Sequence, residues 1–180
     1  MEWVIKMDEL KKRKTPRYQS FDYNSVGVYF ITICTQNRRC ILSRIVGTGV
    51  LDCPQPELTR YGEIADKYIK QLNDFYEHLS VEKYVIMPNH IHLLLWLKEN
   101  KTDNGQSRTP VPTNVERVNN ACSQFVSTFK RFCNKEYGEN IWQARFNDHI
   151  IRNRDDYEEH VKYIYENPMR WYYDELFSEE

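Results

Sequence analysis

The clearest pattern of hydrophobic and polar positions lies in residues 87–97, where two histidines one residue apart stand at the head of an apolar run. A Pro-Asn pair near its start marks a tight turn, and the aliphatic residues that follow favour a strand. Successive side chains of a strand point to opposite faces, so the odd-numbered aliphatic residues share the core face. The other face carries two histidines one residue apart, His90 and His92. The pattern therefore predicts a strand with one apolar face and one imidazole-bearing face.

Other segments also favour strands. β-branched and aromatic residues dominate residues 28–35, which predicts the first strand of the chain. Residues 81–87 form another run that reaches the histidine strand through the Pro-Asn turn, which predicts an antiparallel hairpin. A last short strand is predicted over residues 149–152. Together these strands can form one antiparallel sheet.

Apolar residues recur at helical spacing between the strands. Thr59 can cap a first helix, whose apolar positions run from Tyr61 to Leu79 and would lie on the sheet. A second amphipathic helix is predicted from residue 115 to about residue 135. The resulting β-α-β-β-α-β order predicts an α+β fold, a ferredoxin-like sandwich with an antiparallel sheet and two helices on one face. The two helices would cover the aliphatic face and leave the histidine face open for a site. Leu94 and Trp96 share the histidine face, so we expect the C-terminal helix to lie on or beside this face and to cover part of it.

A third helix is predicted over residues 155–167, because Asn153 can cap its start and Pro168 ends it. At about 100° per residue, Tyr163 and Asn167 fall one turn apart on a polar stripe beside the apolar face. If this helix packs beside the histidine strand, the Tyr163 hydroxyl and the Asn167 amide oxygen can reach a metal held by the histidines. The same spacing also fits an ordinary amphipathic helix with a half-buried tyrosine.

Two imidazoles on one face of a strand can direct neutral ring nitrogens at one point. Such a pair suits a divalent metal that keeps open positions for substrate oxygens. The alternative is a half-exposed strand on which two histidines bind nothing, because motifs this short also occur by accident. The His-x-His pattern alone leaves both interpretations open.

Charge and length limit the choice of function. The 180 residues suffice for one domain. The formal net charge is -1, so any basic surface that binds nucleic acid has to be local. We expect an N-terminal arm over residues 1–20 and a single domain over residues 21–180, with an irregular connection at 46–56 and a flexible one at 99–114. The arm can lie along phosphates or be a solvated terminus. Five of its basic residues fall within seven positions, namely Lys11, Lys12, Arg13, Lys14 and Arg17.

Cysteine usage and hydropathy indicate the compartment. The five cysteines are odd in number, contain no Cys-x-x-Cys pattern and follow no secretory signal, which favours reduced thiols and a cytoplasmic location. No apolar run approaches the roughly 20 residues needed to cross a bilayer. We therefore expect no membrane partner.

Several short motifs follow one another in a specific order between about residues 17 and 171. They are Phe21-Asp22-Tyr23, the segment 27–38, Met87-Pro88-Asn89-His90-Ile91-His92, Phe129-Lys130, Trp142-Gln143, the segment 149–153, Tyr163-Ile164, Asn167-Pro168 and Arg170-Trp171. In this order the motifs resemble those of the single-tyrosine transposases of the HUH nuclease superfamily, named for His-hydrophobe-His. The resemblance is closest to the REP-associated tyrosine transposases.

The resemblance implies roles for particular residues. His90 and His92 would be the metal ligands and Tyr163 the nucleophile. Asn167 stands where related insertion-sequence enzymes carry a metal-binding glutamine, although its side chain is one methylene shorter. The metal implied is Mg²⁺ or Mn²⁺.

Two other histidines, His149 and His160, could assist as a proton acceptor or a phosphate contact, but no motif assigns them. The implied reaction nicks and rejoins single-stranded DNA through a 5′ phosphate linked covalently to the tyrosine. The implied substrate is single-stranded DNA beside a hairpin, and relatives often act as dimers. Beyond the arm, candidate DNA contacts are Lys130, Arg131, Arg145 and Arg152.

Two alternatives to this enzyme remain open. One is a DNA-binding protein that keeps the fold and uses the site weakly or not at all. The other is a metal-dependent phosphodiesterase that uses water in place of the tyrosine. Substitution of Tyr163 distinguishes the transposase from both alternatives, because only the transposase forms a covalent intermediate that requires this residue.

Overall fold

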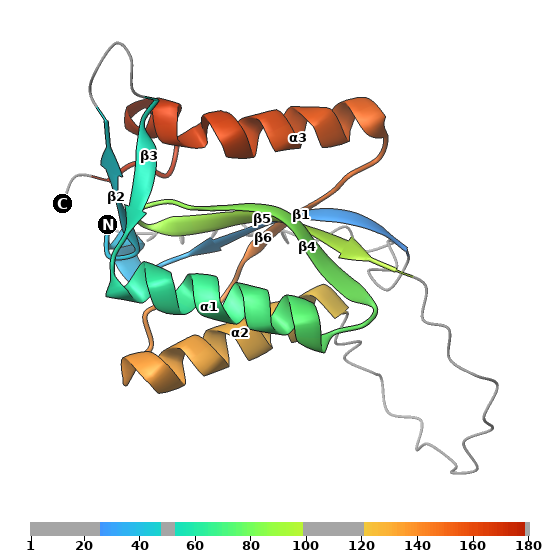
Figure 1. Cartoon of the computed structure of the whole chain (residues 1–180), viewed down its shortest axis with the longest axis horizontal. Coiled ribbons are helices and arrows are strands. Elements are labelled where there is room, and N and C mark those ends of the chain that lie inside the picture. Colours follow the sequence, from blue (N-terminus) through green and yellow to red (C-terminus); the bar gives the residue numbers. More distant parts are fainter. Residues whose placement is uncertain (1–25, 48–52, 99–120, 179–180) are drawn as a thin grey trace, which may run out of the picture.

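A four-stranded antiparallel sheet runs through the middle of the structure, a computed structural model that describes residues 26–47, 53–98 and 121–178 (Figure 1). The strand order across the sheet is β4 (Leu79–Ile86), β5 (His90–Leu97), β1 (Gly27–Cys34) and β6 (Asn147–Ile150). Helices α1 (Arg60–Phe75) and α2 (Ala121–Tyr137) cover one face, and α3 (Arg154–Glu166) lies on the other. The predicted α+β, ferredoxin-like fold is confirmed.

The predicted irregular connection at 46–56 is partly wrong. A short hairpin stands beside the main sheet there, formed by β2 (Ser43–Val46) and β3 (Gln55–Leu58). Its strands have only four residues each and one contains a proline, so the sequence carries little of the alternation that marks a strand. Two 3-10 segments, η1 (Gln36–Arg38) and η2 (Asn167–Tyr173), complete the described elements.

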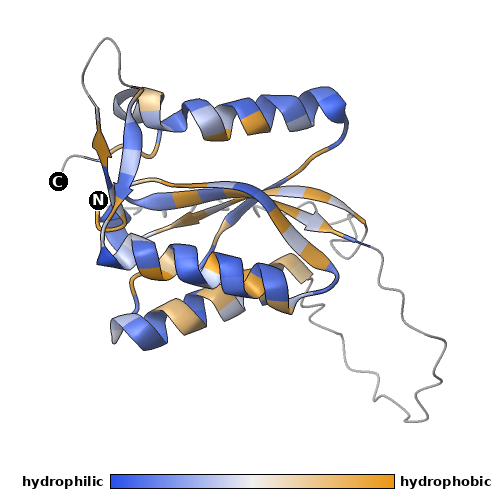
Figure 2. Cartoon of the chain, in the orientation of Figure 1, coloured by the Kyte–Doolittle hydropathy of each residue, from blue (hydrophilic) through white to orange (hydrophobic). Residues whose placement is uncertain are grey.

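The apolar face of β5 forms the centre of the main core. Its odd-numbered aliphatic residues are buried and pack with apolar residues of α1 and α2. Figure 2 shows hydrophobic and hydrophilic residues mixed along both helices. The first helix ends earlier than predicted. Phe75 is its last residue and is 74% exposed, whereas Leu79 is buried as the first residue of β4.

Thr59 and Gly62 determine how α1 begins and how closely its first turn packs against the chain at Leu42. The Thr59 side chain accepts a hydrogen bond from the Gly62 amide, as expected of a helix cap. Gly62 lies so close to the backbone of Leu42 that a Cβ atom built there would collide with the Leu42 carbonyl oxygen. The helix therefore depends on glycine at this position for its close approach to the chain.

The third helix begins as predicted, because the Asn153 side chain accepts a hydrogen bond from the Asp156 amide at 2.9 Å. Directly after its last residue, Glu166, the chain continues as η2, which begins at Asn167 and contains Pro168. The helix is mostly hydrophilic (Figure 2), but Ile164 packs in a second apolar cluster with Leu94 and Trp171. The histidine face of the sheet is therefore covered by α3 and η2, which agrees with the expectation that the C-terminal helix lies on or beside this face.

Some predictions concern parts of the chain outside the described residues. These are the basic arm at 1–20, the start of the domain at 21–25, the flexible connection at 99–114 and the predicted start of the second helix at 115–120. Among the residues that are described, no helix is long and apolar enough to span a membrane.

Candidate active site and metal centre

His90 and His92 lie side by side on the face of β5 that α3 covers. Their ring centroids are 4.4 Å apart, and the two residues are 0% and 3% exposed. The common orientation follows from the strand, because residues i and i+2 share a face. The burial follows from the packing of α3 and of the C-terminal residues against this face.

Asn89 fixes the orientation of the His90 ring. The Asn89 amide nitrogen donates to the Leu176 carbonyl at 2.7 Å, so its oxygen faces the Nδ1 atom of His90, also at 2.7 Å. A carboxamide oxygen only accepts hydrogen bonds, and therefore the proton of the neutral ring lies on Nδ1. The Nε2 atom of His90 then carries the lone pair that a metal ligand requires.

Thr32 plays the corresponding part for His92. The two residues are directly paired in the register of β1 and β5, and the Thr32 hydroxyl lies 2.9 Å from Nδ1 of His92. The hydroxyl can accept a proton from this nitrogen, which leaves Nε2 of His92 with the lone pair. Both imidazoles thus have an outer partner of the kind that orients metal-binding histidines.

Three buried atoms at this site have no hydrogen-bond partner among the described residues. They are Nε2 of His90, Nε2 of His92 and Oδ1 of Asn167, whose residue is 1% exposed. Burial lowers the pKa of His90 to about 4, although the Asp174 carboxylate and the Asn167 carboxamide act in the opposite direction. Burial, together with the neighbouring His90, also holds the pKa of His92 well below its usual range.

Neutral imidazoles and an unpaired amide oxygen are the donors that a divalent cation accepts. Buried polar atoms without a partner are rare in folded proteins and call for an explanation. The donor set formed by His90, His92 and Asn167 therefore fits a divalent metal ion.

Tyr163 lies on α3 beside these donors. Its ring meets the edge of His92 at 5.2 Å between centroids and packs near Phe30 at 5.9 Å. The residue is 37% exposed, and its hydroxyl donates to Oδ2 of Asp174 at 3.2 Å. Burial and the negative charge of Asp174 raise the pKa of Tyr163 to about 12. The phenol is therefore protonated at neutral pH, and a nucleophilic role would require a proton acceptor.

A cavity of about 620 Å³ joins these groups to solvent, and its lining includes His92, His160, Tyr163, Asn167 and Asp174. Sequence reasoning missed Asp174. This residue follows η2 in a segment without hydrophobic periodicity, so nothing in the sequence indicates that it returns to the histidines. One carboxylate oxygen of Asp174 and one ring nitrogen of each histidine lie within 4.8 Å of one another.

Known proteins resemble this chain over most of its length. A protein of Haemophilus influenzae that is provisionally named a REP-associated tyrosine transposase is 32% identical over 160 residues, which cover 88% of this chain and 79% of the relative. The chain belongs to the family of REP-associated tyrosine transposases. The resemblance inferred from the short motifs is therefore confirmed.

Further comparisons agree with this family. The REP-associated tyrosine transposase of Escherichia coli is 28% identical over 148 residues, which cover 82% of this chain and 70% of the relative. A solved structure of a REP-associated tyrosine transposase bound to a REP hairpin has a TM-score of 0.59 and 26% identity, over 86% of this chain and 73% of that one. No protein-family model matches the chain.

The two histidines expected to assist, His149 and His160, form a cluster of their own with Asp156. The rings of His149 and His160 stack at 4.7 Å between centroids, and both lie 3.1 Å from the Asp156 carboxylate. Nδ1 of His160 also lies 2.8 Å from the backbone carbonyl of Asp156, which places the ring proton on that nitrogen. Of this cluster, His160 lines the cavity that contains Tyr163.

The basic residues predicted to contact DNA are not gathered at this cavity. The five residues of the arm lie outside the described residues. Lys130 and Arg131 belong to α2, on the opposite face of the sheet. The Lys130 ammonium donates to the carbonyls of Gln143 at 2.7 Å and Arg145 at 3.1 Å, and burial lowers its pKa to about 8. These contacts give Lys130 a structural part in holding the loop before β6.

The other candidates lie in loops at the ends of β6. Arg145 precedes this strand and Arg152 follows it, and both are exposed. Two arginines that sequence reasoning did not assign lie closer to the site. Arg170 lines the cavity, and Arg38 donates to the backbone of Glu175 at 3.2 Å, beside Asp174.

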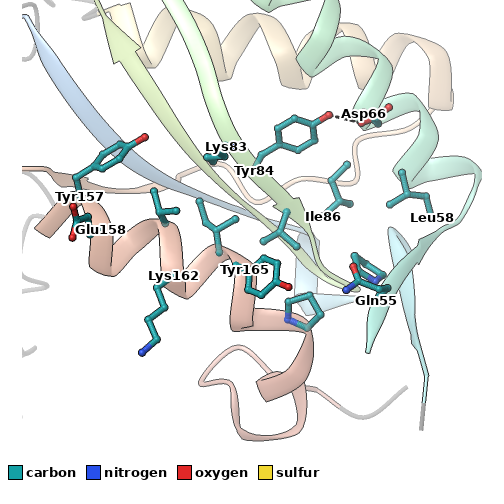
Figure 3. A pocket seen from close by; sticks show the side chains of 15 residues that line it. Gln55, Leu58, Asp66, Lys83, Tyr84, Ile86, Tyr157, Glu158, Lys162 and Tyr165 are labelled. Atoms are coloured by element: carbon teal, nitrogen blue, oxygen red, sulfur yellow. Dashed lines mark hydrogen bonds between the residues drawn. The ribbon is translucent and has the colours of Figure 1, made fainter. Parts of the chain in front are cut away.

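A second hollow, of about 670 Å³, opens between α3 and the strands β3 and β4 (Figure 3). Its lining is mostly apolar, with Tyr165 and Lys162 from α3 at its border. Tyr84 in this hollow donates to Asp66 at 2.6 Å, a contact drawn in Figure 3. The histidines, Tyr163 and Asn167 do not line it, so it is separate from the candidate active site.

Proposed function

We propose that this protein nicks and rejoins single-stranded DNA in a metal-dependent reaction that links a DNA 5′ phosphate covalently to Tyr163. The observation that carries the proposal is that His92, Asn167 and Tyr163 line a single cavity, with His90 directly beside His92, and that the Nε2 atoms of both histidines and the Asn167 oxygen are buried without a hydrogen-bond partner among the described residues. Membership of the transposase family supports it. Each of these side chains has a part in the chemistry.

His90, His92 and Asn167 would hold the metal, which is Mg²⁺ or Mn²⁺. When bound, the cation would stabilise the negative charge that develops on the scissile phosphate. Asn89 and Thr32 keep the Nε2 lone pairs directed at the site, because each forms a hydrogen bond with the Nδ1 atom of one histidine.

The Tyr163 oxygen forms a bond to phosphorus while the bond from phosphorus to the 3′ oxygen of the preceding nucleotide breaks. The phenol loses its proton and the departing 3′ oxygen gains one. We assign the acceptor role to His160, which lines the same cavity and whose Nε2 is left with a lone pair by the contacts of Nδ1 to Asp156. Attack by a 3′ hydroxyl on the phosphotyrosine reverses the step and joins a strand without ATP.

The proposed substrate is a single strand beside a hairpin. The solved relative is bound to a REP hairpin, which supports this class of DNA. Arg170 at the cavity, with Arg38, Arg145 and Arg152, would contact phosphates, and exposed aromatic side chains such as Tyr173 would stack on unpaired bases. We also propose that the basic arm contacts the DNA and that the protein can act as a homodimer.

The test is incubation with a hairpin-bearing single strand and Mn²⁺, followed by denaturing electrophoresis. We expect a protein-DNA adduct that disappears with Tyr163→Phe and persists with Tyr165→Phe. Tyr165 is a matched control because it lies on the same helix and is 70% exposed. Equal adduct in Tyr163→Phe would contradict the assignment of the nucleophile.

The raised pKa of Tyr163 favours one alternative, a DNA-binding protein of the same fold that does not use its tyrosine. That protein would bind hairpin DNA equally well with a chelator and would give no adduct with any divalent metal. A phosphodiesterase that uses water would still cleave DNA with Tyr163→Phe and would leave no covalent product.

A further inference from the structure

Asp174 is the carboxylate that connects the candidate nucleophile with the candidate metal donors. Its Oδ2 atom accepts hydrogen bonds from the Tyr163 hydroxyl at 3.2 Å and from the Asn167 amide nitrogen at 2.7 Å. Its Oδ1 atom accepts from the backbone amide of Leu176 at 2.7 Å. The side chain is therefore held in one orientation by three donors from α3, η2 and the C-terminal segment.

The Asp174 carboxylate has no cationic partner in the part of the chain that the structure describes. Its contacts are the hydroxyl and amide groups just named, and it forms no ion pair with a described lysine or arginine. It is partly buried at the cavity next to two neutral imidazoles. A partly buried anion gains most from a cation at close range.

The position of this charge coincides with the metal donors. A carboxylate oxygen of Asp174 and one ring nitrogen from each of His90 and His92 lie within 4.8 Å of one another. A ligand set of imidazole nitrogens and carboxylate and carboxamide oxygens suits a divalent cation such as Mn²⁺. The hydrogen bond from the Asn167 nitrogen to Asp174 also determines which end of that amide remains free, namely the unpaired oxygen.

We propose that Asp174 is a further ligand of the metal held by His90 and His92, and that it turns the Asn167 oxygen toward the same ion. This inference rests on the proposed function, because it concerns the same metal centre. A negatively charged ligand increases the affinity for a divalent cation. Asp174 is thus both a ligand and a positioning residue for Asn167, whose side chain is short for direct coordination.

The test is titration of the full-length protein, without DNA, with Mn²⁺ in an isothermal calorimeter. We expect Asp174→Asn to weaken Mn²⁺ binding at least tenfold, His92→Ala to abolish it, and Glu175→Gln to leave it within about twofold of the original. Glu175 is the neighbouring acidic residue and lines the same cavity, so it controls for a general loss of negative charge. Thermal denaturation of each metal-free variant checks that the proteins are folded.

Asp174 could instead occupy the place that the scissile phosphate takes. In that case Asp174→Asn would bind Mn²⁺ as tightly as the original protein and would bind hairpin DNA more tightly in the presence of a chelator, and this result would overturn the inference. The proposed function would survive that outcome, provided that His92→Ala still abolishes Mn²⁺ binding. Equal Mn²⁺ binding by the original protein and by His92→Ala would contradict the metal centre itself.

Discussion

Thr32 offers a direct test of how the outer hydrogen bonds support the metal donors. Valine has nearly the same shape as threonine and equally favours a strand, so Thr32→Val removes little except the hydroxyl that lies 2.9 Å from His92. A buried donor without a partner costs about 1–3 kcal/mol. We expect the free energy of unfolding of the metal-free protein to fall by that amount.

The effect on the metal should be of similar size. Loss of an outer partner of a metal-binding histidine typically weakens binding by about 10- to 100-fold, which corresponds to about 1.4–2.7 kcal/mol. Calorimetric titration with Mn²⁺ measures the affinity, and urea unfolding measures the stability. Thr32→Ser keeps the hydroxyl and should bind the metal within a few-fold of the original. Equal Mn²⁺ affinity of the valine variant and the original would refute the orienting role of Thr32.

Three other predictions test the fold and the charges. Gly62→Ala should lower the melting temperature. The close contact of a Cβ atom with the Leu42 carbonyl should cost more than the roughly 1 kcal/mol by which alanine stabilises a helix relative to glycine. A rise in melting temperature would contradict this prediction. The pKa of the buried His90 is depressed, so the metal-free protein should lose stability as the pH falls from about 6.5 to about 4. Urea unfolding across this range measures the effect, and a free energy of unfolding that does not change with pH would refute the prediction. Lys130→Met should reduce the free energy of unfolding by about 1–3 kcal/mol, and hairpin binding measured by gel shift should change little. Unchanged stability with weaker hairpin binding would instead indicate that Lys130 contacts DNA.

Much of the fold could be predicted because its signals are local. The alternation around His90 and His92 determines which side chains share a face, and a strand keeps that relation in any tertiary context. The cap at Asn153 likewise depends on residues within one turn. With these elements in place, the β-α-β-β-α-β order leaves few ways to pack helices on a sheet.

The parts that could not be predicted depend on contacts between distant residues. Asp174 reaches the histidines because η2 turns the chain back toward β5, and no periodicity precedes that turn. The pairing of Thr32 with His92 depends on the register between two strands that are 60 residues apart in sequence. Burial of the histidine face depends on the small apolar patch around Ile164, within a helix that is otherwise mostly polar.

The central claim is that Tyr163 attacks a DNA phosphate beside the metal held by His90 and His92. The most direct measurement is mass spectrometry of the peptide that stays joined to DNA after reaction with a hairpin-bearing strand and Mn²⁺, followed by proteolysis. The linked nucleotide should be found on Tyr163, and the adduct should be absent from His90→Ala. DNA attached to another tyrosine, such as Tyr165 or Tyr173, or an adduct that forms equally in His90→Ala, would contradict the account.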